Sequence, residues 1–161
     1  MAVVGVSHMA LLVSDLDTSL KFYCGVLGFR QLVKFEHVGT PANSPSTAQL
    51  LEIEDLDQSL TFIERDGHRI ELIHMDRPKA TGDRGKKPFN RLGYTHLSVK
   101  IADFDGELDR LRQAGVTVLE NTIASDPSAN ARFAFILDPD GNRVELFGMI
   151  DEKGRPAWNF D

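Results

Sequence analysis

The sequence predicts an α+β fold built from two tandem βαβββ modules, and an internal repeat is the main reason. Residues 5–13 and 93–101 share one strand-like alternation of apolar residues, with a glycine and a histidine in register. An acidic residue and an amphipathic helix follow each strand, and each half ends in strands around a tight turn. A repeat constrains the fold more strongly than local propensity does. We therefore expect a first module at 1–76, a linker at 77–91, a second module at 92–150 and a C-terminal tail at 151–161.

The helix of each half has a start and a stop in the sequence. Asp15 and Asp103 are good N-cap residues, since an aspartate side chain accepts hydrogen bonds from the first free backbone amides. Gly28 and Gly115 stand where a left-handed C-cap would end each helix. The apolar residues at helical spacing between them are Leu16, Leu20, Tyr23 and Leu27 in the first half, and Phe104, Leu108 and Leu111 in the second.

Three further strands complete each half. In the first half we expect them at 29–37, 60–64 and 70–75, with the last two joined at Asp66-Gly67, a strong hairpin signal. In the second half we expect them at 116–119, 132–137 and 143–147, with the last turn at 138–142. Residues 48–57 fit either an extension of the second strand or a small extra hairpin.

Composition excludes several classes of function. The 161 residues, 42% of them hydrophobic, suit one compact unit or two small ones sharing a core. No apolar run approaches the roughly 20 residues of a membrane helix, and the N-terminus lacks a signal peptide, so we expect a cytoplasmic protein that binds no membrane. The single cysteine, Cys24, rules out an internal disulfide framework. A net charge of −6 argues against nucleic acid, which leaves a small molecule as the expected partner.

Two histidines and two glutamates repeat with the modules. Strand alternation places His8 on one face with Val6 and Leu12, so its imidazole is expected among apolar neighbours. Glu71 and Glu145 stand in apolar strands, where an unpaired carboxylate is costly to bury. A single such residue is usually a hydrogen-bonded strand residue. Because both halves carry the same pair, we predict that His8, Glu71, His96 and Glu145 bind one divalent metal ion.

The chain resembles the vicinal oxygen chelate superfamily, the group of glyoxalases, bleomycin-resistance proteins and extradiol dioxygenases. The resemblance rests on Ser7-His8, Asp15-Leu16-Asp17, residues 22–29 (FYCGVLGF), Ile70-Glu71-Leu72, Thr95-His96-Leu97 and residues 138–146 (DPDGNRVEL). It implies a curved mixed sheet from each module, two such sheets closing into a cup, and a metal with open coordination positions inside. It also implies a homodimer, with modules paired within or between chains.

The resemblance favours a metal-dependent lyase or isomerase of the glyoxalase type. In that reaction the metal stabilises an enediolate formed next to a carbonyl, while the glutamates transfer protons, with Glu145 the main base and Glu71 its partner. Zn, Ni, Mn, Co or Fe would each suit the ligand set. The alternatives are an Fe(II) ring-cleaving dioxygenase using His8, His96 and Glu145, an epimerase of acyl thioesters, and a metal-free binding or resistance protein.

Two features leave the substrate open. Glutathione-dependent relatives often carry Arg or Lys where this chain has Gly25, so the thiol carrier is undetermined. The linker cations would suit either a clamp for an anionic substrate or a solvated loop. These cations are Arg77, Lys79, Arg84, Lys86, Lys87 and Arg91. In the tail, we expect Trp158 and Phe160 to pack against the protein.

Overall fold

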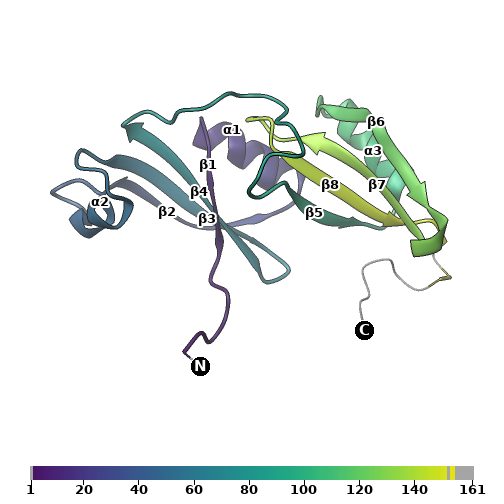
Figure 1. The fold of residues 1–161 in the computed structure, drawn as a ribbon, viewed down its shortest axis with the longest axis horizontal. Helices are drawn as coiled ribbons and strands as arrows, with labels where there is room; N and C mark the ends of the chain where they lie inside the picture. Colours follow the sequence, from purple (N-terminus) through teal and green to yellow (C-terminus); the bar gives the residue numbers. More distant parts are fainter. Residues whose placement is uncertain (1, 152, 155–161) are drawn as a thin grey trace. The chain divides into compact units, whose positions relative to one another are not determined.

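The computed structural model describes residues 2–151, 153 and 154 and has an α+β fold with two mixed four-stranded sheets (Figure 1). The chain divides into two compact units, Met1–Asp83 and Arg84–Asp161, and each contains one βαβββ module. The predicted fold class and the repeat are therefore confirmed. The boundary between the units falls within the expected linker at 77–91. The expected packing of Trp158 and Phe160 concerns residues outside the described part of the chain.

The first unit forms a sheet in the order β1-β4-β3-β2. Strand β1 runs parallel to β4, whereas β3 is antiparallel to both β2 and β4. Its elements are β1 (Met9–Leu12), α1 (Leu16–Leu20), the π-helical turns η1 (Lys21–Val26), β2 (Arg30–Val38), α2 (Pro45–Leu51), β3 (Asp57–Arg65) and β4 (His68–Arg77).

The second unit repeats this topology with the order β5-β8-β7-β6. The first strand again pairs in parallel with the last, and the other pairs are antiparallel. Its elements are β5 (His96–Ile101), α3 (Phe104–Gln113), β6 (Val118–Asp126), the short 3-10 helix η2 (Pro127–Ala129), β7 (Ala131–Leu137) and β8 (Arg143–Met149). Corresponding strands of the two units can therefore be compared residue by residue.

The helix ends are those that the sequence predicts. The Asp15 carboxylate accepts a hydrogen bond of 2.7 Å from the Thr18 amide, and Asp103 accepts one of 3.0 Å from Gly106. Each cap satisfies an amide that the helix itself leaves without a partner. Gly28 and Gly115 have φ angles of 73° and 74°, the left-handed conformation that ends a helix at low cost for glycine.

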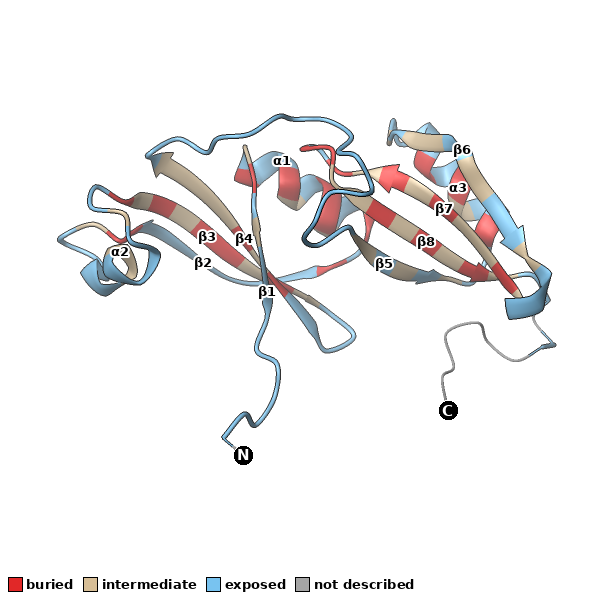
Figure 2. Ribbon diagram, viewed as in Figure 1, coloured by how far each residue is buried: buried red, intermediate tan, exposed pale blue. Residues whose placement is uncertain are grey.

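Each sheet buries one face and leaves the other less covered. In the second unit, Ile136, Val144 and Leu146 are fully buried on the face toward α3, as is Leu111 of that helix. Figure 2 shows buried and intermediate residues alternating along β8. Burial of each such side chain contributes about 2 kcal/mol. The opposite face carries Glu145 and is only partly buried, so it is open to a ligand.

The structure settles the segment at 48–57. The helix α2 covers 45–51 and β3 begins at Asp57, so neither a longer second strand nor an extra hairpin forms there. The first strand is also shorter than expected, because β1 begins at Met9 and residues 2–8 form no regular element. Among the described residues, no helix is long and apolar enough to cross a membrane.

Candidate metal centre

The structure brings each predicted histidine to the glutamate of its own unit. In the first unit, the His8 Nε2 atom lies 3.2 Å from the Glu71 Oε2 atom. In the second unit, His96 Nε2 lies 3.5 Å from Glu145 Oε2. The same ring nitrogen faces a carboxylate in both cases. Each unit therefore presents one imidazole nitrogen and one carboxylate oxygen side by side.

Strand register explains why the two pairs are equivalent. In the parallel pair β1 and β4, Ala10 lies beside Glu71, and in β5 and β8, Ser98 lies beside Glu145. Each histidine stands two residues before the partner of the glutamate. In the second unit, His96 and Ser98 both belong to β5, and residues two apart on a strand point to the same face, which brings the imidazole to the side of Glu145. In the first unit, His8 precedes β1, and its contact with Glu71 shows that it reaches the corresponding side.

A phenylalanine accompanies each pair. Phe62 on β3 is the cross-strand partner of Glu71, and Phe135 on β7 is the partner of Glu145. The Phe62 ring lies edge-on to His8 with centroids 5.1 Å apart, and Phe135 lies 5.4 Å from His96. These rings limit the orientations open to each imidazole. Sequence reasoning did not identify them, although an apolar residue at this register occurs in both halves.

A hydroxyl group holds the other nitrogen of each ring. Ser7 Oγ lies 3.0 Å from His8 Nδ1, and Thr95 Oγ1 lies 2.9 Å from His96 Nδ1. Partners at the second nitrogen commonly fix the tautomer and direction of a ligating histidine. With Nδ1 bound to a hydroxyl, Nε2 remains the nitrogen available to a metal. The signal in the sequence is a hydroxyl residue immediately before each histidine.

The predicted surroundings of His8 are wrong. Val6 is 93% exposed and Leu12 is 41% exposed, so these residues do not form an apolar wall around the imidazole. The reason is that strand alternation does not apply to Val6 and His8, which precede β1. The His8 side chain is 33% exposed, whereas the Glu71 side chain is 16% exposed. The first His–Glu pair is thus partly buried, and the glutamate is its more buried member.

The donor types fit a divalent ion, because neutral imidazole and ionised carboxylate are ligands that Zn, Mn, Ni, Co and Fe accept. Each pair supplies two donors. Among the residues that the structure describes, no three or more His, Cys, Asp or Glu side chains form a group that could hold a metal ion. The single centre made of His8, Glu71, His96 and Glu145 therefore remains a prediction.

Three of the linker cations are paired with acidic side chains. Arg77 lies 2.7 Å from Asp55, and the Lys79 ammonium lies 3.7 Å from Asp76. Arg84 lies 3.8 Å from Asp140 in the turn before β8. Cys24 has no evident role at a site, because burial raises the pKa of its thiol and so disfavours the reactive thiolate.

Comparison with known proteins gives one consistent family. The model of the Glyoxalase/Bleomycin resistance protein/Dioxygenase superfamily matches residues 5–146. A probable lactoylglutathione lyase of Synechocystis sp. is 27% identical, with 91% of this chain and 96% of the relative covered. A 2-epi-5-epi-valiolone epimerase of Actinomyces sp. is 31% identical over 91% of this chain and 80% of its own length. The crystal structure of a glyoxalase family protein from Bacillus cereus superimposes with a TM-score of 0.78 at 20% identity, covering 92% of this chain and 98% of that one.

Proposed function

The chain belongs to the Glyoxalase/Bleomycin resistance protein/Dioxygenase superfamily, and from this we propose that it is a metal-dependent lyase or isomerase of the glyoxalase type. Its substrate would be a small molecule with a carbonyl next to an acidic carbon. His8, Glu71, His96 and Glu145 would together hold one divalent ion. Members of the superfamily commonly use such an ion.

The observation that carries the proposal is the equivalence of the two His–Glu pairs. In both units the carboxylate oxygen lies within 3.5 Å of the histidine Nε2 atom, and in both the histidine stands at the same register relative to the glutamate. Hydrophobic packing alone gives no reason for repeating a partly exposed imidazole and carboxylate in each sheet. A shared ligand that needs both pairs does give one.

The glutamates would carry the proton transfer. The bound ion would supply Lewis-acid stabilisation of the negative charge that develops on the substrate oxygens. Glu145 would remove the proton from the carbon next to the carbonyl and return it to the neighbouring carbon, as a general base and then a general acid. Phe135 opposite Glu145, and Phe89 stacked on His96, would keep water away from one side of this pair. Glu71 would bind the ion and assist the second proton step.

The names of the relatives support the reaction class, but they do not point to one substrate. The Actinomyces relative is named an epimerase, and an epimerase can begin with the same removal of a proton beside a carbonyl. A ring-cleaving dioxygenase fits less well. Such enzymes place an acid–base tyrosine on the strand before the final glutamate, whereas this strand presents Phe133 and Phe135.

Metal analysis followed by two assays tests the proposal. The purified protein, supplied in turn with Zn, Ni, Mn, Co or Fe, should isomerise a hemithioacetal without consuming oxygen. Glu145→Gln should lower kcat at least about 100-fold, because it removes the base without removing bulk. Glu120→Gln is the matched control, since Glu120 pairs with Arg112 away from both His–Glu pairs. Oxygen consumption with a catechol, or a protein that binds no metal, would contradict the proposal.

A further inference from the structure

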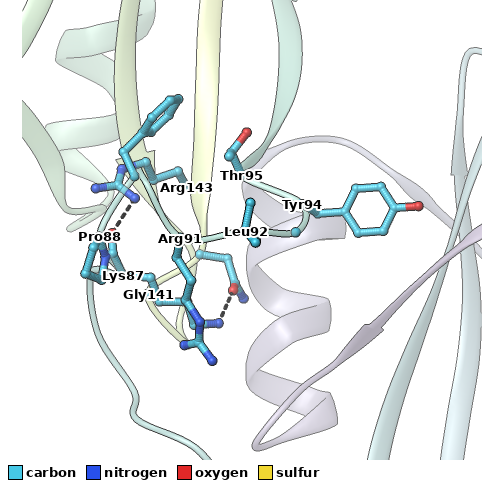
Figure 3. Close-up of a pocket in the computed structure, with 11 residues that line it drawn as sticks. Lys87, Pro88, Arg91, Leu92, Tyr94, Thr95, Gly141 and Arg143 are labelled. Atoms are coloured by element: carbon cyan, nitrogen blue, oxygen red, sulfur yellow. Dashed lines mark hydrogen bonds between the residues drawn. The ribbon is translucent and has the colours of Figure 1, made fainter.

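The second unit contains a pocket that the His–Glu pairs do not form. Residues 87–89, 91–95 and 141–143 line it, and its volume is about 270 Å³ (Figure 3). Lys87, Arg91 and Arg143 are among its lining residues. Two of them come from the linker and the third begins β8. The pocket therefore depends on the linker lying against the last turn of its own unit.

We propose that this pocket binds a small oxyanion, a carboxylate or a phosphate, carried by the substrate. Its lining contains three cationic side chains, and no Asp or Glu occurs among the described residues that form it. The chain as a whole has a net charge of −6, so three lining cations without an acidic lining residue are unusual for this chain. Guanidinium and ammonium groups bind carboxylate and phosphate oxygens through strong charge-assisted hydrogen bonds.

The cations retain donors for such a ligand. The Arg91 guanidinium forms no hydrogen bond or ion pair with any residue in the described part of the chain. The Lys87 ammonium gives one hydrogen bond, of 2.8 Å, to Asn142 Oδ1. Arg143 donates one hydrogen bond, of 2.5 Å, to the Lys87 carbonyl. Because an arginine carries five N–H groups and a lysine three, most of these donors have no partner among residues 2–151, 153 and 154.

The wall of the pocket is fixed before any ligand binds. Gly141 has a φ angle of 78°, and Gly85 passes so close that a side chain at 141 would overlap its backbone. The Gly85 amide donates to the Asp140 carbonyl at 3.3 Å. The Arg143 guanidinium also lies over the rings of Phe89, at 5.4 Å, and Phe135, at 5.9 Å. Preorganised donors cost less entropy when an anion binds.

The pocket adjoins one of the His–Glu pairs. Phe89, which lines it, stacks on the His96 ring with centroids 6.0 Å apart and planes 23° from parallel. Arg143 is the cross-strand neighbour of His96, and Thr95 both lines the pocket and contacts the imidazole. An anion held here would place the rest of a small molecule beside His96 and Glu145. The role as a substrate anchor rests on the proposed function, whereas anion binding itself does not.

Titration with inorganic phosphate and with sodium acetate, followed by amide NMR shifts of the full chain, tests the proposal. We expect saturable shifts at residues 87–95 and 141–143. Arg91→Gln should weaken phosphate binding about tenfold, because it removes charged donors that make no contact within the described fold. Lys86→Gln is the matched control, since it removes the same type of charge one residue away from the lining residue Lys87 and should change the affinity little.

The titration is repeated after a chelator has removed bound metal. Binding that persists, with Arg91→Gln weaker than Lys86→Gln, supports the pocket even if the protein isomerises no substrate, so the two proposals can fail separately. Three results would overturn it: no saturable shifts in the pocket, equal losses in the two variants, or binding that disappears with the metal. If phosphate binds more strongly than acetate, the natural ligand carries a phosphate group. If acetate binds more strongly, the natural ligand carries a carboxylate.

Discussion

The two hydroxyl groups beside the histidines decide which ring nitrogen faces the carboxylates. A hydroxyl can accept a hydrogen bond from a protonated Nδ1, and the neutral imidazole then keeps a lone pair on Nε2. Ser7 and Thr95 are placed for this, at 3.0 Å and 2.9 Å from Nδ1. With a metal ion bound, the lone pair on Nε2 and the neighbouring oxygen of Glu71 or Glu145 would both face the ion, whereas without a cation two such acceptors would repel each other.

Thr95→Val tests this role at the level of one atom group. Valine keeps the branched shape and removes the hydroxyl, so the His96 ring loses the partner that orients it. We expect the variant to bind metal about 10-fold more weakly. Thr95→Ser, which keeps the hydroxyl, should bind metal as the parent protein does. A competition titration against a metal-binding dye measures both, and equal affinities for the two variants would exclude an orienting role.

At this scale, sequence reasoning identified the four candidate ligands but not the hydroxyls. The histidines and glutamates were recognisable because they repeat in both halves, and because an unpaired imidazole or carboxylate is costly to bury in an apolar strand. Adjacent residues on a strand normally point to opposite faces, so Ser7 and Thr95 were not expected to contact the neighbouring rings. Both hydroxyl residues precede the first residue of their strand, which is Met9 in β1 and His96 in β5, and the alternation rule does not apply there.

The N-terminus of α3 shows how a cap constrains the helix that follows it. The Asp103 carboxylate occupies the space where a side chain at position 106 would begin, and it accepts a hydrogen bond from the Gly106 amide. Glycine inside a helix costs about 1 kcal/mol relative to alanine, and the loss of an aspartate cap costs a similar amount. The two effects should therefore oppose each other at this helix end.

A double-mutant cycle checks this balance. Gly106→Ala alone should change the free energy of unfolding by less than about 0.5 kcal/mol, since the gain in helix propensity is offset by displacement of the cap. In the Asp103→Ala background, where no cap remains to be displaced, the same change should stabilise the protein by about 1 kcal/mol. Urea unfolding followed by circular dichroism measures all four proteins. Equal effects in the two backgrounds would show that the side chains do not interact.

Elements with a local signal were predictable, and elements without one were not. Asp15, Asp103 and the turn at Asp66-Gly67 carry their own chemistry, and the structure has helix starts and a hairpin at those places. The helix α2 is flanked by Ser44 and Glu52, both in the left-handed conformation and without a side-chain cap. Ser44 followed by Pro45 is a helix-start signal that the sequence analysis did not use, but Glu52 is not typical of a left-handed C-cap, so no residue signals where this helix ends.

The strand β6 is a second case of this kind. It extends through Asp126, well beyond the apolar stretch that predicted it. Its pairing with β7 is interrupted between Leu119 and Ala124, and the Thr122 hydroxyl bridges the irregularity by bonding the Leu119 carbonyl and the Phe135 amide. A bulge of this type breaks the alternation on which strand prediction depends.

At the scale of the whole molecule, the duplication divides the candidate ligands into two equal halves. The first unit contains His8 and Glu71, and the second contains His96 and Glu145. Protein metal centres of this type use three or four side-chain ligands, so two donors alone would hold an ion weakly. A duplicated pair is useful to a metal only when both copies serve one ion, whether the two modules belong to one chain or to two chains of a dimer.

The number of bound ions distinguishes a shared centre from two separate half-sites. A shared centre predicts one ion per chain. His8→Ala or His96→Ala should each weaken the binding of that ion, because either change leaves three donors, and the double variant, left with the two carboxylates alone, should lose it. Elemental analysis of gel-filtered protein gives the ratio, and His68→Ala, at the exposed first residue of β4, is the control. Two ions per chain, with one lost in each single variant, would mean that each unit binds its own metal, and proton transfer between the two glutamates at a common ion would then be impossible.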